Sequence, residues 1–327
     1  MDIKTLDYQA SQEIKDVISS IGRTEDVKFS MDERRLAITD FLVNKIHLFE
    51  LCIDNDASTV IKLTKCITIC SDDFKRPHGI VFLGNDHFVV ANRDGDITLF
   101  ECPKTSLETS EIQLKALQIF KGSRFYGKIW SPGSVASYEM ENGTYRVIVC
   151  NNYLHTVISF TVDLTDNVKI KNKGVLIKRG LSTPDGVCVS PNKKWVAISN
   201  HDKSEVRIYK LTPVLNRFSD ADGKLVGTAH PHGIRFSECG DKLFVANASG
   251  QHLQVYQNQN DSWKGIFEPI RTVKIVDDDV FAKADDQPEE GGVKGIEIAN
   301  MGKLFVASAE HHVMDFYSTD DLLNCPA

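Results

Sequence analysis

The sequence lacks the features that mark membrane and secreted proteins. Within its 327 residues, no stretch approaches the roughly 18 consecutive apolar residues of a membrane span. The first twenty residues, MDIKTLDYQASQEIKDVISS, have neither the basic start nor the apolar core of a secretory signal. The eight cysteines include no CxxC pair and no metal-finger spacing. We therefore expect a cytoplasmic protein with reduced thiols and no membrane partner.

Positive charge is also in the minority, with 38 Lys and Arg against 45 Asp and Glu and a net charge of −7. A protein whose main partner is a phosphate backbone normally has a basic face, and the sequence contains no Lys/Arg cluster that could form one. We expect no nucleic-acid partner. A content of 42% hydrophobic and 25% charged residues also excludes a disordered or low-complexity chain.

What the sequence does have is an internal repeat. Six segments fit one template of three short strands joined by polar turns: 24–51, 76–101, 131–162, 183–211, 230–257 and 292–318. Alternating apolar residues between turn residues are typical of β-hairpins. A fourth strand follows in most units, at 59–69, 114–120, 174–179, 223–228 and 270–276. No convincing amphipathic helix competes with this pattern.

Units of three to four strands repeated six times predict an all-β fold, a six-bladed β-propeller of four-stranded blades. The path from the last unit through both termini to the first is as long as the other spacings, so we expect residues 1–327 to form one domain. The last unit ends after three strands. We expect the N-terminus, at about Glu13–Ser19, to supply the missing outer strand and to close the ring.

In a propeller the inner strands line a central channel, and the turns that lead into them surround one mouth of it. The residues at these six turns are Glu25, His78, Gly133, Asp185, His232 and Lys294. Six-fold order places Glu25 opposite Asp185 and places His78 opposite His232. Two carboxylates and two imidazoles that converge are a candidate divalent-metal site. Lys294 would add a cation nearby, which either favours an anionic substrate or opposes the binding of a metal.

The same residues also have a purely structural interpretation. Pro-x-Gly before a strand is ordinary turn chemistry, in which the middle residue is often incidental. A second ring of residues ends the second strand of each unit: Asp40, Asn92, Asn151, Asn200, Asn247 and Ser308. Because one residue class recurs in every unit, we expect this second ring to form local hydrogen bonds to the backbone.

The segments PDGVCVSPNKKWVAIS and PHGIRFSECGDKLFVAN resemble the regucalcin/gluconolactonase-like six-bladed propellers, and more loosely the NHL-repeat and lactonase propellers. The resemblance implies a divalent metal at the channel mouth, often calcium or zinc, and hydrolysis of lactones or esters. It implies that Glu25 and Asp185 are ligands, with Asp185 also the general base. The family's second-blade Asn is replaced here by His78, and Ser131–Ser134 in the third blade offers no Asn.

Two further segments carry candidate residues. The run from Gly122 to Trp130 is either a pocket wall that binds substrate through Arg124, Tyr126 and Trp130 or a connector whose aromatic side chains cover a blade edge. The acidic stretch 276–292 lacks the alternating spacing of a calcium loop. We expect a solvated loop there, and its role stays open.

Two functions remain open at this point. The first is a metal-dependent hydrolase of a small lactone or ester, with Ca, Zn or Mn as the possible ion. Glu25, Asp185, His78 and His232 would hold the metal, and Asp185 or one of the two histidines would act as the catalytic base. The second is a non-catalytic propeller that binds a small molecule or a protein at the same mouth. No nucleophile elbow, P-loop or HExxH motif is present.

Overall fold

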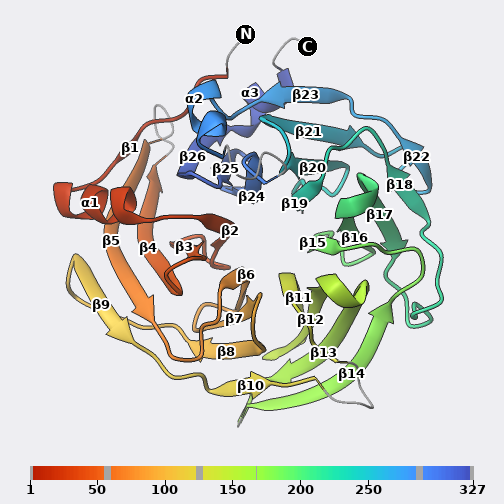
Figure 1. The fold of residues 1–327 in the computed structure, drawn as a ribbon, viewed down its shortest axis with the longest axis horizontal. Coiled ribbons are helices and arrows are strands. Elements are labelled where there is room, and N and C mark those ends of the chain that lie inside the picture. Colours follow the sequence, from red (N-terminus) through yellow and green to blue (C-terminus); the bar gives the residue numbers. More distant parts are fainter. Residues whose placement is uncertain (1–2, 55–59, 123–127, 167, 285–289, 325–327) are drawn as a thin grey trace.

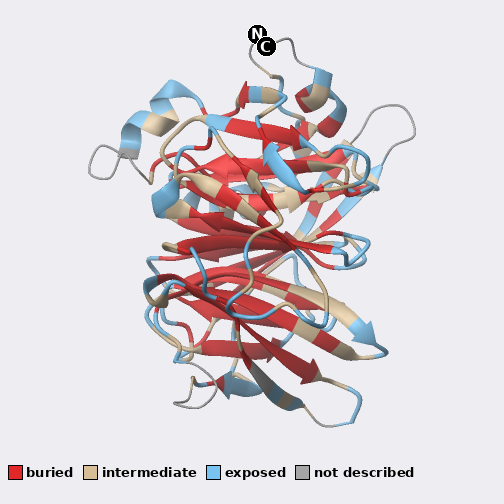
Figure 2. Ribbon diagram, turned by 90° about the vertical axis from the view of Figure 1, so that its right-hand side faces the viewer, coloured by how far each residue is buried: buried red, intermediate tan, exposed pale blue. Residues whose placement is uncertain are grey.

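The computed structural model describes residues 3–54, 60–122, 128–166, 168–284 and 290–324. Within these residues, six sheets surround a central axis as the blades of a propeller (Figure 1). The predicted all-β, six-bladed architecture is confirmed, and most blades have the predicted four strands. Figure 2 shows that the buried residues follow the strands through the body of the molecule, whereas exposed residues gather at the connecting loops.

The inner strand of each blade lies next to the channel. These strands are β2 (Thr24–Phe29), β6 (Pro77–Leu83), β11 (Pro132–Glu141), β15 (Pro184–Val189), β19 (Pro231–Phe236) and β24 (Val293–Ala299). The second strands are β3 (Arg35–Asp40), β7 (His87–Asn92), β12 (Thr144–Asn151), β16 (Trp195–Asn200), β20 (Lys242–Asn247) and β25 (Leu304–Ala309).

The third strands follow by hairpin connections, as the alternating pattern predicts. They are β4 (Lys45–Asp54), β8 (Ile97–Glu101), β13 (Thr156–Asp163), β17 (Glu205–Lys210), β21 (His252–Gln257) and β26 (His312–Ser318). The outer strands are β5 (Val60–Cys70), β10 (Gln118–Phe120), β14 (Lys169–Ile177), β18 (Gly223–Leu225) and β23 (Arg271–Lys274). Three more short strands pair in parallel with outer strands: β1 (Tyr8–Gln9) and β9 (Thr109–Gln113) with β5, and β22 (Gly265–Phe267) with β18.

The prediction that Glu13–Ser19 forms an outer strand of the last blade is wrong, because this segment lies in the helix α1 (Gln12–Ser20). Ser11 caps the helix by accepting a hydrogen bond from the Ile14 N–H at 3.3 Å. A cap of this kind satisfies a backbone donor that would otherwise be unpaired. Ile14 is completely buried among the apolar residues of the first blade, so helical periodicity prevails over the strand expected there.

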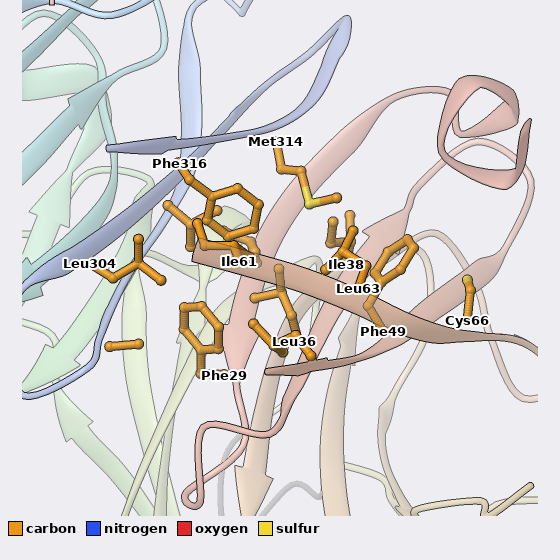
Figure 3. Close-up of a cluster of buried hydrophobic side chains, with 14 of the residues drawn as sticks. Phe29, Leu36, Ile38, Phe49, Ile61, Leu63, Cys66, Leu304, Met314 and Phe316 are labelled. Atoms are coloured by element: carbon orange, nitrogen blue, oxygen red, sulfur yellow. The ribbon is translucent and has the colours of Figure 1, made fainter. Parts of the chain in front are cut away.

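The N-terminus nevertheless connects the first and last blades. The strand β1 pairs with β5 of blade one, and the Leu6 N–H donates a 2.7 Å hydrogen bond to the Phe316 carbonyl of blade six. Side chains of both blades also share one apolar cluster, in which Phe29, Leu36 and Phe49 lie with Leu304, Met314 and Phe316 (Figure 3). The ring is therefore closed by this apolar packing and one backbone bridge, and blade six keeps three strands among the described residues.

Adjacent inner strands approach each other closely near the first mouth, the end of the channel where the inner strands begin. Blades two, four and five have a Pro-x-Gly turn at this point, so a glycine follows His78, Asp185 and His232. A Cβ atom on Gly186 would collide with the His232 carbonyl oxygen, and one on Gly233 would collide with the Lys294 carbonyl oxygen. These glycines are thus required by the spacing of the blades as well as by the turn.

Five of the six members of the second ring have the local hydrogen-bonding role that its repetition predicts, whereas Ser308 Oγ is buried without a hydrogen-bond partner among the described residues. Asn92 Oδ1 accepts a 3.0 Å hydrogen bond from the Lys75 N–H, and Asn247 Oδ1 accepts a 2.8 Å bond from the Ala229 N–H. Equivalent bonds tie Asn151 to the Trp130 N–H and tie Asn200 to the Ser182 N–H. Each side chain anchors the segment that precedes the inner strand of its own blade.

Helices contribute little to this architecture. The acidic stretch contains α2 (Asp278–Phe281) and a 3₁₀ turn (Ala282–Ala284), and its residues 285–289 lie outside the described part of the chain. The last helix, α3 (Thr319–Asn324), follows blade six. None of the helices in the described ranges has the length and apolar character needed to cross a membrane.

Candidate functional site

Four predicted residues meet at the first mouth. Glu25 lies between the two histidines, with its Oε2 atom 3.5 Å from His78 Nε2 and 3.5 Å from His232 Nε2. Asp185 lies beside both imidazoles, with Oδ2 at 3.3 Å from His232 Nε2 and Oδ1 at 3.9 Å from His78 Nε2. The inner strands of blades one, two, four and five therefore bring two carboxylates and two imidazoles into one cluster.

Lys294, from blade six, joins this cluster on the other side of Glu25. Its Nζ atom lies 3.1 Å from Glu25 Oε1, and Arg23 Nε lies 2.5 Å from the same oxygen. Glu290 and Glu310 in turn lie 3.0 Å and 3.8 Å from Lys294 Nζ. Two cations thus hold one carboxylate oxygen of Glu25, and its Oε2 atom is left facing the histidines.

Two residues of the site are missing from the sequence-based set. Arg93 Nη2 lies 2.5 Å from His78 Nε2 and 3.5 Å from Asp185 Oδ1. Asn152 donates a 2.8 Å hydrogen bond from Nδ2 to Asp185 Oδ1. Both follow directly after the second-ring residue of their blade, at the end of β7 and of β12. That position could have identified them, since the ring itself is visible in the sequence.

The third blade has no Asn at its inner turn but supplies Asn152 from the neighbouring strand end. Gly133 holds the turn position, and a Cβ atom there would lie 2.5 Å from Asn152 Oδ1 and 2.6 Å from Asp185 Oδ1. Glycine at 133 therefore leaves the space that the Asn152 amide occupies. Asn152 Oδ1 is buried and has no hydrogen-bond partner within the described part of the chain.

The two carboxylates are ionised in this environment although neither is more than 3% exposed. Burial opposes the charge of Glu25, but the Lys294 ammonium and the Arg23 guanidinium outweigh it and hold the pKa of this carboxyl well below its usual range. Burial likewise opposes the charge of Asp185. His232 and the Arg93 guanidinium outweigh this effect and lower the pKa of this carboxyl. The cluster is thus an anionic pair surrounded by donors.

The two imidazoles differ from each other. Burial and the Arg93 guanidinium hold the pKa of His78 well below its usual value, so this ring is neutral. Burial also disfavours a charge on His232, but the Asp185 and Glu25 carboxylates outweigh it and raise the pKa of this ring. One mouth therefore presents a neutral and a readily protonated imidazole, whose ring centroids lie 5.2 Å apart.

The donor set fits a divalent ion of the zinc type. Ligand atoms of Glu25, His78 and His232 all lie within 4.8 Å of one another. Bonds of about 2.0–2.2 Å to a tetrahedral ion place neighbouring ligands about 3.3–3.6 Å apart, and the Oε2-to-Nε2 separations here are 3.5 Å. Glu25 Oε2 and His232 Nε2 are buried without a hydrogen-bond partner among the described residues.

The same geometry argues against calcium and identifies a competitor for the ion. Calcium takes six to eight oxygen ligands, whereas two of the donors here are imidazole nitrogens. The Arg93 guanidinium occupies the lone pair of His78 Nε2, so it has to move before this nitrogen can bind an ion. Glu25, His78 and His232 would hold the metal, and Asp185 and Asn152 lie beside them.

Of the predicted aromatic segment, only the end is described. Arg124 and Tyr126 lie outside the described residues. The Trp130 side chain is 60% exposed and packs edge-on against Tyr153, which is 59% exposed, at a centroid distance of 5.9 Å. These two residues precede β11 and follow β12, so the pair lies on the rim of the first mouth in blade three.

The family model described as "Lactonase, 7-bladed beta-propeller" matches residues 9–265 of the chain. The chain belongs to this lactonase family. As a lactonase-family propeller it has six blades in place of the seven in the family description, and blade six lies beyond the matched region. The resemblance to lactonase-like propellers that the repeats suggested is thereby confirmed. No curated protein matches the chain in sequence.

Solved structures show the same fold at low sequence identity. A candidate 6-phosphogluconolactonase from Bacteroides uniformis is 13% identical with a TM-score of 0.57, over 86% of this chain and 77% of that one. A luciferin-regenerating enzyme is 13% identical with a TM-score of 0.58, over 92% and 94%. A protein of unknown function from Desulfotomaculum acetoxidans is 14% identical with a TM-score of 0.56, over 88% and 79%.

Proposed function

We propose that this lactonase-family propeller hydrolyses a small lactone or ester at the first mouth with the help of a divalent metal. The observation that carries the proposal is that Glu25 Oε2 and His232 Nε2, which lie 3.5 Å apart beside His78, are buried and have no hydrogen-bond partner among the described residues. Buried polar atoms without partners are costly, and an ion bound between them would remove that cost. Family membership supports the lactone as substrate class.

Each polar side chain at the mouth has a role in this scheme. Glu25, His78 and His232 would hold the metal, which when bound polarises a carbonyl group and lowers the pKa of water. Asp185 would accept the proton of the water that attacks the lactone carbonyl, and that proton would pass to the ring oxygen as the C–O bond breaks. Lys294 and Arg93 would attract the carboxylate that forms. The product is the open hydroxy acid.

Access to this buried cluster has to pass more exposed charged residues. The side chains of Arg23, Arg93 and Glu290 are 16%, 19% and 29% exposed, whereas those of Glu25 and His78 are 0% and 1% exposed. The outer layer contains two guanidinium groups, which favour a substrate with an anionic substituent.

The direct test combines metal analysis with a hydrolysis assay. The purified protein is analysed for metal, and ring opening of γ- and δ-lactones and of an aryl ester is followed by pH-stat with and without added Zn²⁺ or Mn²⁺. We expect about one ion per chain and metal-dependent turnover, with metal lost in Glu25→Gln and turnover lost in Asp185→Asn. Arg76→Gln, a substitution of an exposed arginine, is the matched control. A wild-type protein that neither retains nor responds to any of these ions would refute metal dependence.

A second candidate function is retention of the fold for binding alone, and the exposed Trp130–Tyr153 pair is the observation that favours it. Large aromatic side chains at a mouth are typical binding anchors. If the mouth only binds, Trp130→Ala will abolish ligand or partner binding while Asp185→Asn leaves it unchanged. If the mouth is catalytic, the reverse ranking holds for turnover.

A further inference from the structure

A cavity lies at the end of the channel opposite the first mouth, and we call this end the second mouth. The cavity has a volume of about 270 Å³ and shares no lining residue with the cluster at the first mouth. Every inner strand contributes to it the residue three positions after its first-mouth residue: Lys28, Val81, Ala136, Cys188, Arg235 and Glu297. A step of three is needed because each inner strand has a register irregularity near its start.

These six residues at the second mouth fall into two halves. Blades five, six and one contribute Arg235, Glu297 and Lys28, which are all charged. Blades two, three and four contribute Val81, Ala136 and Cys188, and none of them carries a charge. The Cys188 thiol stays protonated because burial raises its pKa well above the usual value. A cavity with one charged and one apolar half suits an amphipathic small molecule.

Within the charged half the acids are already engaged. Glu297 Oε1 accepts hydrogen bonds from Arg235 Nε at 2.7 Å and from the Ile298 N–H at 3.2 Å, and its Oε2 lies 3.6 Å from Lys28 Nζ. Asp26 Oδ2 accepts from the Ile80 N–H at 3.1 Å. The carboxylates of this half therefore have few free acceptor positions for a ligand.

The cations of the charged half are less fully used. Lys28 Nζ has three N–H groups and, within the described part of the chain, one hydrogen bond, to Asp26 Oδ1 at 3.3 Å. Arg235 donates from Nε and Nη1, whereas its Nη2 lies 4.0 Å from Asp26 Oδ1 and has no hydrogen-bond acceptor among the described residues. Both side chains are at most 12% exposed and line the cavity. Their free N–H groups are therefore available to a ligand that carries a hydrogen-bond acceptor.

The apolar half is large enough for one ring. Blades two to four add Phe82, Val135, Tyr145 and Val189 to its wall, and Phe29 of blade one also lines the cavity. A dry apolar cavity of about 150 Å³ accommodates benzene, so 270 Å³ leaves room for a carboxylate beside such a ring. The remaining acid in the wall, Glu139, is turned toward the β11–β12 connection, where its Oε1 accepts a 3.0 Å hydrogen bond from the Gly143 N–H.

We propose that the second mouth binds a small monocarboxylate with an apolar body of about one ring, whose carboxylate is held by Lys28 and Arg235 and whose body lies against Val81, Ala136 and Cys188. This site is independent of the chemistry at the first mouth. Its ligand is an effector or a cargo molecule, since the Cys188 thiol of the apolar half is buried and uncharged and is therefore unsuited to nucleophilic attack.

Calorimetric titration with phenylacetate tests the proposal. Phenylacetamide is the uncharged comparison, and acetate is the comparison that lacks the apolar ring. We expect phenylacetate to bind about tenfold or more tightly than either, because a charge-assisted hydrogen bond and an apolar ring are each worth about that factor. Lys28→Met and Ala136→Leu, one from each half, should each weaken binding about tenfold. Asp185→Asn, at the first mouth, should leave it unchanged.

Three results would overturn the proposal. The first is no heat or chemical-shift change with phenylacetate at millimolar concentration. The second is equal binding of acetate, which would indicate only an anion effect. The third is binding that survives Ala136→Leu but is lost in Asp185→Asn, which would assign the ligand to the first mouth. Circular dichroism and the melting temperature of each variant exclude unfolding as the cause, and Ala136→Leu keeps the site testable if Lys28→Met is unstable.

Discussion

Lys294 Nζ lies 3.1 Å from Glu25 Oε1, and both side chains are completely buried at the channel mouth. The two residues are 269 positions apart, in the last and the first blade. Their ion pair therefore reinforces the closure of the ring at its axis, where the apolar cluster of blades one and six reinforces it farther out. The same pair turns the other oxygen of Glu25 toward the histidines.

We expect Lys294→Met to destabilise the protein by about 3–5 kcal/mol, because removal of one partner leaves a buried charge without compensation. The double variant Glu25→Gln/Lys294→Met should recover a large part of this loss, since neither charge remains. Urea denaturation of the wild type, the two single variants and the double variant gives the coupling energy. A loss below about 1 kcal/mol in the single variant would show that Arg23 alone suffices to balance Glu25.

Gly233→Ala should destabilise the protein by about 3 kcal/mol or more, because its Cβ would collide with the Lys294 carbonyl oxygen of the adjacent blade. Gly250→Ala is the matched control, since nothing lies within 4 Å of a Cβ at that position. Thermal denaturation and soluble yield of the two variants provide the comparison. Equal stability of the two variants would mean that the inner strands can separate without cost.

The sequence was informative where one chemical requirement recurs in every blade. Turn residues, alternating strands and the ring that contains Asn92 and Asn247 repeat six times, so the architecture and the convergence of Glu25 with Asp185 could be predicted. The helix α1 occurs once. Its nine residues contain only a short apolar face, and the vacant edge of the last blade favoured a strand for the same segment.

Contacts that depend on exact register could not be predicted. Arg93 and Asn152 reach the site because they follow the second-strand turn of blades two and three, and a one-residue change would direct them elsewhere. The charged half of the second mouth has the same origin. Arg235 and Lys28 face the channel only because an irregularity in each inner strand changes the alternation from two residues to three.

Arg93→Met should raise the affinity of the first mouth for Zn²⁺ about tenfold. The substitution removes a positive charge that lies 2.5 Å from His78 Nε2, one of the nitrogens that would bind the ion. Competition with a chromophoric chelator measures this affinity, and Arg76→Met, at an exposed arginine, is the control. Unchanged or weaker Zn²⁺ binding in Arg93→Met would contradict the assignment of His78 as a ligand.

Glu205→Gln should cost about 1–2 kcal/mol at pH 7 and progressively less in acid. Glu205 Oε1 accepts from Arg207 Nε at 2.6 Å and from Asn200 Nδ2 at 2.9 Å; burial opposes its charge, but these partners outweigh it and lower its pKa. A carboxyl whose pKa is lower in the folded state stabilises that state above its unfolded pKa of about 4.3, and this contribution is lost as the pH falls through the folded value. Urea midpoints of wild type and variant should therefore differ at pH 7 and converge toward about pH 3. Glu141→Gln, at an exposed position, should show no such convergence, and a difference for Glu205→Gln that is constant with pH would assign the loss to shape instead of charge.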